Sequence, residues 1–198
     1  MLGGLFTREG EVMVKNYNEV LYANETIKTQ RLVLRKFRIE DAADILEYAS
    51  DAQTMEFLVW EGLTTIEEAR AAVYDYYWAR PGIWAIELAE GGKMIGAIDL
   101  RLEHDHDKAE FGYVLNRGYW GKGYMTETLA AVMALCFDKL EVNRFEACHY
   151  VGNEGSGRVM EKCGMKREGC MAQSVKIKGI FRDNVMYGIT REDYALLR

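Results

Sequence analysis

The sequence lacks the features that mark membrane-spanning, secreted and nucleic-acid-binding proteins. No run of apolar residues is long enough to cross a membrane, and residues 1–10 lack the charged start and apolar core of a signal peptide. The net charge is −6, from 25 Lys and Arg against 31 Asp and Glu, whereas a nucleic-acid binder usually presents a basic face. We therefore expect a cytoplasmic protein that has neither a membrane nor a nucleic acid as its partner.

Cysteine and histidine are also scarce, and their spacing argues against disulfides and metal sites. The four cysteines contain no CxxC pair: Cys136, Cys148, Cys163 and Cys170. Cys136 and Cys163 fall within apolar helical patterns, which favours free thiols in a reducing compartment. In the stretch His104-Asp-His-Asp107 both histidines would lie on one side of an extended chain, but no third group of ligands is evident. A solvated turn between strands is the better interpretation, and we expect no metal.

Proline occurs once, in the turn Pro81-Gly82, and neither repeats nor an interdomain linker are visible. A chain of 198 residues with 49% hydrophobic residues is long and apolar enough for one domain with a sizeable core. Residues 1–28 show no clear periodicity and predict an N-terminal extension, either as one short helix or as a partly disordered arm. The domain itself is expected over residues 29–198.

Within that domain, strand-like and helix-like patterns alternate. Strands are predicted over residues 29–37, 83–88, 93–101, 109–115, 144–151, 170–178 and 183–190. Helices are predicted over residues 39–49, from about 65, over 124–139 and over 154–163. At the second helix, Thr65 and Glu68 have the spacing of a capping box, and Ala69, Val73 and Tyr76 follow on one side.

The most informative stretch is the glycine turn Tyr119-Trp-Gly-Lys-Gly-Tyr-Met-Thr-Glu127, which joins a predicted strand to a predicted helix. A helix start has free backbone N–H groups and the positive end of the helix dipole, and glycine lets a ligand approach closely. The turn is not a P-loop, because no Ser or Thr follows Lys122. It is not a dinucleotide fingerprint either, because Thr126 stands where a third glycine is required. These residues alone leave open a phosphate cradle and an ordinary strand-to-helix turn.

Two further blocks place the turn in a wider pattern. The domain opens with Gln30-Arg-Leu-Val-Leu-Arg35, and later contains Asn153-Glu-Gly-Ser-Gly-Arg-Val-Met-Glu-Lys-Cys-Gly-Met165. With the turn, these blocks resemble the GNAT superfamily of acetyl-CoA-dependent N-acetyltransferases, and within it the branch of RimJ/RimL-type ribosomal-protein N-terminal acetyltransferases. The turn departs from the superfamily's pyrophosphate loop at two positions, with Trp120 in place of Gln or Arg and Met125 in place of Gly or Ala.

The resemblance extends from Thr29 to about Tyr194 and implies an α/β (α+β) GNAT fold. In this fold a mixed, mostly antiparallel sheet is flanked by helices, and its central strands, here 109–115 and 144–151, splay apart to admit acetyl-CoA. The resemblance also implies acetyl-CoA as co-substrate, with its pyrophosphate at the N–H groups of residues 121–126. That set comprises Gly121, Lys122, Gly123, Tyr124, Met125 and Thr126.

The remaining binding residues follow from the same resemblance. A backbone N–H at Tyr113 or Leu115 would hold the oxyanion that develops on the thioester. Asn153 would hydrogen-bond the pantetheine arm or fix the turn before its helix, and simple N-capping is the alternative.

Acetyl transfer requires an amine that has lost its proton, although an α-amino group with a pKa near ~8 is mostly charged at pH 7. Glu110, on the strand before the glycine turn, is the candidate base, directly or through water. An exposed carboxylate, an ion pair with Arg101 and a water chain without a dedicated side chain are the alternatives. Met160 occupies the position of the superfamily's usual tyrosine acid, so Ser156 is the candidate donor to the thiolate, or else a plain helix-start serine.

The sequence leaves the acceptor open between a protein N-terminus and a small amine such as an aminoglycoside or a polyamine. The leading hypothesis is an acyltransferase that acts by direct transfer in a ternary complex, as a monomer or a homodimer. A Cys148–His149 nucleophile is rejected, because neighbouring strand residues point to opposite faces. A non-catalytic acyl-CoA-binding module and a scaffold that acts through the N-terminal arm are the rival hypotheses. Any role of the aromatic cluster at residues 74–78 also stays open.

Overall fold

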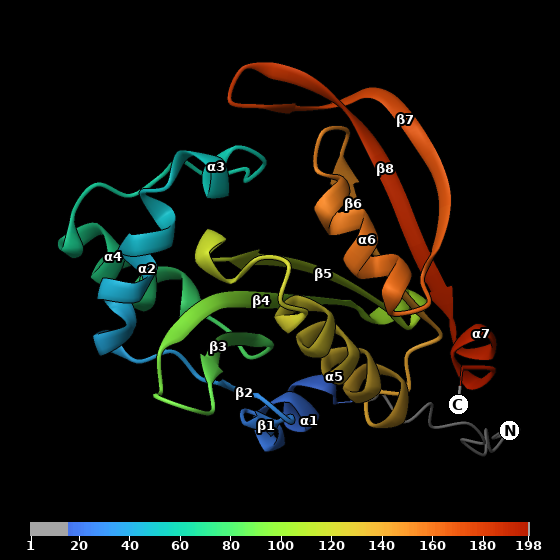
Figure 1. The fold of residues 1–198 in the computed structure, drawn as a ribbon. Coiled ribbons are helices and arrows are strands. Elements are labelled where there is room, and N and C mark those ends of the chain that lie inside the picture. The colour runs from blue at the N-terminus through green and yellow to red at the C-terminus, as the bar shows by residue number, and fades with distance from the viewer. Residues whose placement is uncertain (1–15, 198) are drawn as a thin grey trace, which may run out of the picture.

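One eight-stranded sheet organises the chain in the computed structural model, which describes residues 16–197 (Figure 1). The strands are β1 (Ile27–Lys28), β2 (Leu32–Arg35), β3 (Ile83–Leu88), β4 (Met94–Glu103), β5 (Lys108–Leu115), β6 (Arg144–Tyr150), β7 (Lys166–Ile177) and β8 (Ile180–Thr190). Their order in the sheet is β1-β2-β3-β4-β5-β6-β8-β7. All neighbouring pairs are antiparallel except β5 and β6, which are parallel. The predicted mixed, mostly antiparallel sheet flanked by helices is confirmed.

Helices cover both faces of this sheet. The helices are α1 (Tyr17–Ala23), α2 (Ala42–Ala49), α3 (Ala52–Met55), α4 (Ile66–Ala72), α5 (Tyr124–Asp138), α6 (Glu154–Lys162) and α7 (Arg191–Ala195). Short 3-10 turns occur at η1 (Ile39–Asp41), η3 (His104–His106) and η4 (Arg117–Tyr119), and a π-helical turn occurs at η2 (Val73–Tyr77). None of the helices within residues 16–197 is long and apolar enough to span a membrane.

The two faces of the sheet carry two separate apolar clusters. Along β3, Trp84 and Ile86 join the cluster that includes residues of α1, α5 and α6. The alternate residues Ile83 and Ala85 join the cluster that includes residues of α2 and α4. Because side chains alternate across a strand, a strand covered on both faces is apolar along its length, as β3 is.

The parallel pair β5 and β6 separates after a short region of contact. Only Lys108, Ala109 and Glu110 of β5 have partners on β6, which are Arg144, Phe145 and Glu146. Beyond them β5 stays paired with β4 as far as Leu115, and β6 stays paired with β8 as far as Tyr150. The sheet therefore opens into a V at its centre, as predicted.

The second predicted helix begins as expected but differs in the face that it buries. Thr65 and Glu68 form the capping box, with both hydrogen bonds at 3.2 Å. The helix then continues into the π-helical turn η2, in which the Trp78 N–H bonds the Val73 carbonyl at 3.0 Å. Because a π turn adds one residue, Tyr77 rather than Tyr76 follows Val73 on the buried side. The prediction that Tyr76 lies on that face is wrong, since Tyr76 is 50% exposed.

Two smaller predictions concern scarce residue types. Residues 104–106 form the turn η3 between β4 and β5, as expected. Within residues 16–197, no group of three or more His, Cys, Asp or Glu side chains is arranged to hold a metal ion. The four cysteines are free thiols, and Cys136 is fully buried in the main core. Helix α3 was not predicted, because its four residues are too few for a helical period.

Helix α1 belongs to the domain core even though it falls within the predicted N-terminal extension. Tyr17 and Leu21 are 2% and 3% exposed and lie in the same cluster as Trp84. The Tyr17 hydroxyl donates to Asp107 at 2.6 Å, and the Trp84 indole donates to the Asn24 carbonyl at 3.1 Å. Residues 17–24 are therefore packed on the domain, whereas residues 1–15 of the extension lie outside the described residues.

We expect Leu21→Ala to lower the free energy of unfolding by about 3 kcal/mol, because it removes a fully buried side chain from a packed core. The neighbouring Tyr22 is 58% exposed. Tyr22→Ala is the matched control and should change stability by less than about 0.5 kcal/mol. Urea unfolding of both variants makes the comparison. Equal midpoints for Leu21→Ala and the wild type would show that α1 is not part of the cooperative unit.

Candidate functional site

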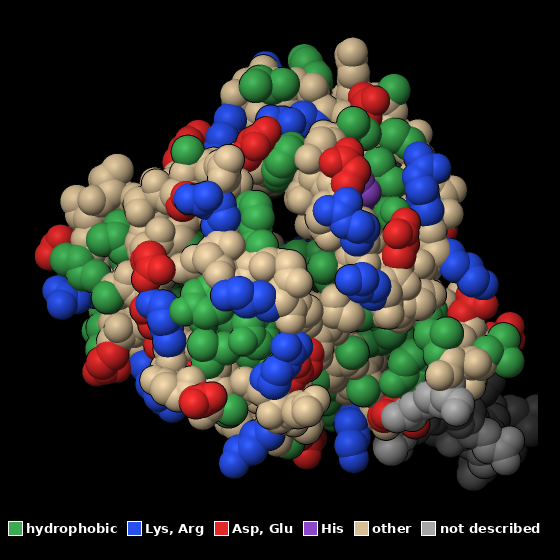
Figure 2. Space-filling view, in the orientation of Figure 1, with side chains coloured by type: hydrophobic (Ala, Val, Ile, Leu, Met, Phe, Trp, Pro, Cys, Tyr) green, Lys and Arg blue, Asp and Glu red, His purple; other side chains and the backbone are tan. Residues whose placement is uncertain are grey.

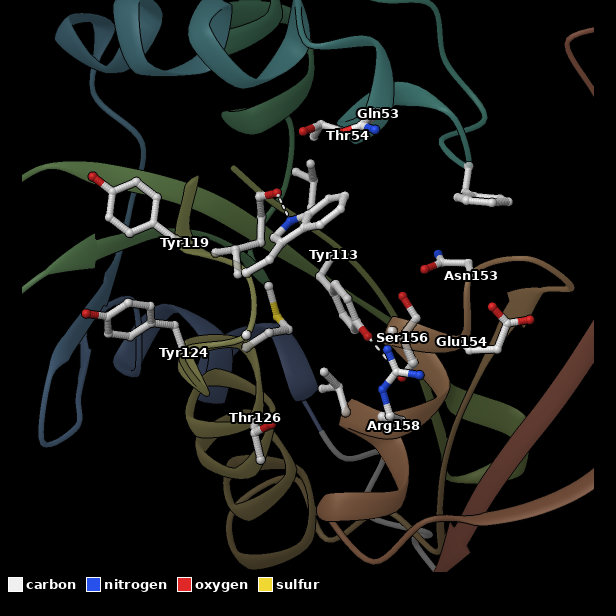
Figure 3. Close-up of a pocket in the computed structure, with 18 of the residues that line it drawn as sticks. Gln53, Thr54, Tyr113, Tyr119, Tyr124, Thr126, Asn153, Glu154, Ser156 and Arg158 are labelled. Atoms are coloured by element: carbon white, nitrogen blue, oxygen red, sulfur yellow. Dashed lines mark hydrogen bonds between the residues drawn. The ribbon is translucent and has the colours of Figure 1, made fainter. Parts of the chain in front are cut away.

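A cavity of about 530 Å³ occupies the open end of the V between β5 and β6. This volume lies in the range of small-molecule and cofactor sites. Figure 3 shows that its walls come from distant parts of the chain: the end of β5, the glycine turn, the α3 region and the start of α6. In Figure 2 the molecule is hollowed between α6 and the α3 segment, and Lys and Arg side chains gather on the surrounding face.

The glycine turn presents its backbone N–H groups at this cavity. Gly121 and Gly123 have positive φ angles of 73° and 80°, a conformation that only glycine adopts without strain. Gly123 is the N-cap of α5, and the first helical hydrogen bond runs from the Glu127 N–H to its carbonyl at 3.0 Å. Within residues 16–197 the N–H groups of 121–126 have no acceptor, so the turn presents free donors at the positive end of a helix.

Most residues of the predicted phosphate loop line the cavity, but one does not. Gly121, Gly123, Tyr124, Met125 and Thr126 form part of the wall. The Lys122 side chain folds back instead: its ammonium donates to the Gly118 carbonyl at 2.9 Å and lies 5.1 Å from the Tyr119 ring centre. Lys122 therefore contributes its backbone to the loop, while its side chain braces the turn.

The free edge of β5 also faces the cavity. The Asn116 N–H bonds the Ile95 carbonyl on the β4 side at 2.8 Å. Since successive N–H groups of a strand point to opposite sides, those of Leu115 and Tyr113 point into the V. The Leu115 carbonyl accepts a hydrogen bond from the Trp120 indole at 2.7 Å, consistent with this direction. Trp120, which replaces the family's Gln or Arg, thereby ties the glycine turn to β5.

The start of α6 forms the opposite wall. Asn153 is the N-cap of α6 but makes no capping hydrogen bond through its side chain, so plain N-capping does not explain it. Ser156 is half-buried, and its hydroxyl has no hydrogen-bond partner in the part of the chain that the structure describes. The Tyr113 hydroxyl donates to the Ser156 carbonyl at 3.3 Å, which ties this wall to β5 (Figure 3).

A second cavity, of about 260 Å³, adjoins the first. Tyr113, Asn153 and Ser156 line both cavities, and so do Phe57 and Leu58 from the segment after α3. The two cavities therefore meet at one point between β5 and α6. This arrangement suits two ligands that approach one another from opposite ends.

Glu110 lines the second cavity and is 48% exposed at its side chain. One of its oxygens lies 3.3 Å from an Arg101 nitrogen, so the ion pair that the sequence left open as an alternative is present. Arg101 also contacts Asp99 at 3.1 Å, and Asp99 accepts a hydrogen bond from the Tyr76 hydroxyl at 2.5 Å. Burial and this hydrogen bond raise the pKa of Tyr76 to about 12, so its phenol stays neutral.

The second cavity also contains Cys148 and His149, but not as a catalytic pair. Burial raises the pKa of the Cys148 thiol, which keeps it protonated and weakly nucleophilic. The His149 ring nitrogen Nδ1 lies 3.0 Å from the Tyr150 carbonyl rather than beside the thiol. The rejection of a Cys–His nucleophile therefore agrees with the geometry.

Sequence reasoning missed several wall residues. Phe57 and Leu58 follow a helix of four residues and carry no motif, so nothing in the sequence singled them out. Arg158 and Lys162 of α6 also line the first cavity. Their spacing of four residues within the helix was a usable signal, because it places two cations on one helix face.

Three comparisons with known proteins agree with this geometry. The family model described as "Acetyltransferase (GNAT) domain" matches residues 31–166. The protein described as uncharacterized N-acetyltransferase YnaD of Bacillus subtilis (strain 168) is 30% identical over 168 residues, covering 85% of this chain and 98% of that protein. A GNAT-family acetyltransferase structure from Bacillus anthracis superposes with a TM-score of 0.77 at 30% identity, covering 84% of this chain and 99% of that one.

One of the similar solved structures with a bound ligand is a coenzyme A complex. It is described as RimL, the ribosomal L7/L12 alpha-N-protein acetyltransferase, in complex with coenzyme A. It superposes with a TM-score of 0.73 at 24% identity, covering 84% of this chain and 98% of that one. At this identity the likeness shows a shared fold.

Gly123→Val should raise the dissociation constant for coenzyme A at least about tenfold, because a β-branched side chain disfavours φ near 80° and crowds the free N–H groups. Gly91 is the matched control: its φ is 82°, and a Cβ there would meet nothing within 4 Å. Gly91→Val imposes similar strain on the turn between β3 and β4 and should leave binding unchanged. Calorimetric titration of both variants decides, and equal affinities would contradict the assignment of the turn.

Proposed function

Since the chain belongs to the GNAT family and is an N-acetyltransferase, we propose that it transfers an acetyl group from acetyl-CoA directly to a primary amine. The observation that carries this proposal is the junction of the two cavities at Tyr113, Asn153 and Ser156. In this proposal one cavity receives the acyl donor and the other receives the amine. Such an arrangement favours a ternary complex, because both reactants are oriented before the chemical step.

The first cavity fits the parts of acetyl-CoA in turn. Free N–H groups at residues 121–126 would donate hydrogen bonds to the pyrophosphate oxygens, and Arg158 and Lys162 would add positive charge nearby. The open edge of β5 offers strand-like hydrogen bonds to the amides of the pantetheine arm. The N–H of Tyr113 or of Leu115 would stabilise the oxyanion that forms from the thioester carbonyl.

Ser156 is the proposed proton donor to the departing thiolate. Its hydroxyl is unpaired within the described residues, and Ser156 lines both cavities, where it would meet both ligands. Met160 stands where the family usually has a tyrosine, and its thioether has no proton to donate. The Asn153 amide, free of any capping role, is available to hold the pantetheine arm.

Glu110 is the proposed base. It lies on the wall of the second cavity, and it is exposed enough to take a proton from the amine directly or through water. The Arg101 guanidinium, 3.3 Å from one Glu110 oxygen, holds the carboxylate on this wall.

We further propose that the acceptor is the α-amine of a protein N-terminus, such as that of a ribosomal protein. The support is the likeness in fold to RimL, together with the resemblance of the blocks at residues 30–35 and 153–165 to that branch. Titration with acetyl-CoA, followed by thiol-release assays on N-terminal peptides and on small amines, tests both the proposed reaction and the proposed acceptor. Binding with turnover on peptides supports the proposal. Turnover only on aminoglycosides or polyamines would show that the acceptor is a small amine and not a protein N-terminus. Binding without turnover on any amine would favour a non-catalytic acyl-CoA-binding module.

Ser156→Ala should lower kcat by about 100-fold, because the thiolate would leave without a positioned donor. The KM for acetyl-CoA should change by less than about threefold, since the hydroxyl acts on the sulfur in the transition state. Ser50→Ala is the control: its hydroxyl bonds the Glu47 carbonyl at 3.3 Å at the end of α2. Steady-state kinetics separate the two parameters. A rise in KM at constant kcat would assign Ser156 to binding only.

Glu110→Gln should lower kcat by about 100-fold near pH 6 and by much less near pH 9. The reason is that the amine is protonated at low pH and needs a base, whereas at high pH solvent has already removed its proton. Glu168→Gln is the control, because Glu168 is also paired with an arginine and is 40% exposed at its side chain. The measurement is kcat against pH for both variants. A loss that is constant across this range would remove Glu110 as the base.

A further inference from the structure

Arg31, in the loop between β1 and β2, lies against the glycine turn that follows it by about ninety residues. Its Nη1 donates to the Lys122 carbonyl at 3.0 Å, and its Nε donates to the Glu127 carboxylate at 2.6 Å. The centre of its guanidinium lies 4.6 Å from the Tyr124 ring centre. A single side chain therefore contacts the turn, the first turn of α5 and an aromatic ring between them.

The contact between Arg31 and the Lys122 carbonyl determines which way the Gly123 N–H points. A trans peptide is planar, so the carbonyl of Lys122 and the N–H of Gly123 point in opposite directions. Arg31 is not part of the cavity wall, whereas Gly123 is. By holding the carbonyl on its own side, Arg31 turns the Gly123 N–H away from itself, toward the cavity. Flanking glycines make this peptide easy to rotate, so an external contact is needed to fix it.

The contact between Arg31 and Glu127 offsets the negative charge of the Glu127 carboxylate. The Glu127 carboxylate is 17% exposed and accepts hydrogen bonds from the Thr29 hydroxyl at 2.6 Å and from the Arg31 N–H at 2.8 Å. Burial raises the pKa of this carboxyl, but the hydrogen bonds from Thr29 and Arg31 outweigh it and lower the pKa overall. Glu127 is therefore ionised, close to the helix start that would receive a phosphate. The Arg31 guanidinium offsets this negative charge.

We propose that Arg31 is a positioning residue for the pyrophosphate of coenzyme A: it orients the peptide between Lys122 and Gly123 and neutralises Glu127. The inference rests on the proposed function, because it presumes that the glycine turn binds the pyrophosphate. Arg31 lies near the start of the domain in sequence. It would act through the glycine turn and would not touch the reacting atoms.

Arg31 has little to do in holding the sheet together. The strand that it precedes is anchored separately, since Arg35 of β2 pairs with Asp41 at 2.7 Å and with Glu87 at 2.6 Å. The Arg31 side chain is 43% exposed, and its own carbonyl accepts the Ala89 N–H at 2.9 Å, a bond that survives any substitution of the side chain. Removal of the guanidinium should therefore disturb the turn more than the fold.

The test compares two acyl donors, acetyl-CoA and S-acetylpantetheine, which lacks the pyrophosphate. For Arg31→Ala we expect the KM and dissociation constant for acetyl-CoA to rise about tenfold or more, with kcat changed less than about twofold. With S-acetylpantetheine, kcat/KM should stay within about twofold of the wild type. Arg31→Lys keeps the charge but lacks the forked pair of donors, so its KM for acetyl-CoA should lie between the values of the wild type and Arg31→Ala. Arg31→Ala combined with Glu127→Gln should recover part of the affinity, because no unpaired carboxylate remains beside the phosphate.

Lys36→Ala is the control, because Lys36 forms an exposed ion pair with Glu25 at 3.4 Å and lies at the other end of β2 from Arg31. It should leave all constants unchanged. An Arg31→Ala variant with unchanged acetyl-CoA affinity, or with equal losses on both donors, would overturn the positioning role alone. A wild-type protein that binds no acetyl-CoA would overturn the proposed function and this inference with it.

Discussion

The short parallel contact between β5 and β6 is the constraint on which the rest of the site depends. Pairing covers only residues 108–110 and 144–146, after which each strand continues with its other neighbour. A strand edge inside a domain leaves N–H and carbonyl groups without partners, which is costly unless water or a ligand supplies them. A long molecule with amide groups, such as the pantetheine arm, suits this edge. The opening therefore leaves the sheet incomplete at its centre, and in the proposed function it is where acetyl-CoA binds.

The starts of two helices, α5 and α6, complete the cavity that opens between β5 and β6. The starts of α5 and α6 both lie on the wall of the larger cavity, and neither uses a side chain to cap its own free N–H groups. Two positive helix ends at one cavity favour a ligand that carries negative charge. Contacts from remote segments then brace these ends: Trp120 bonds β5, Tyr113 bonds α6 and Arg31 bonds the glycine turn. The site therefore consists of two helix starts whose positions are fixed by side chains from other parts of the chain.

The second cavity, which is the proposed acceptor site, is built differently from the first. Its wall combines aromatic rings with Asp99, Arg101 and Glu110, whose charges are paired with one another. Aromatic residues 76 and 77 reach this wall because the π-helical turn advances the helix by one residue. Phe57 reaches it from a segment without regular structure. In the proposed function the acceptor would contact aromatic residues from a π-helical turn and from a loop, and loops commonly determine specificity within one fold.

Local chemistry in the sequence by itself determined the glycine turn, the Thr65 capping box, the hairpin of β3 and β4, and the apolar face of α5. Each of these depends on residues within about one or two turns of the chain, so periodicity and backbone preference suffice. Tertiary structure alone decided that Tyr77 replaces Tyr76 in the core, that α1 belongs to the domain, and that Lys122 turns away from the cavity. It also decided the pairing of Glu110 with Arg101 and of Arg31 with the turn. These outcomes depend on which distant groups compete for the same donor or the same space, and that competition exists only once the sheet has formed.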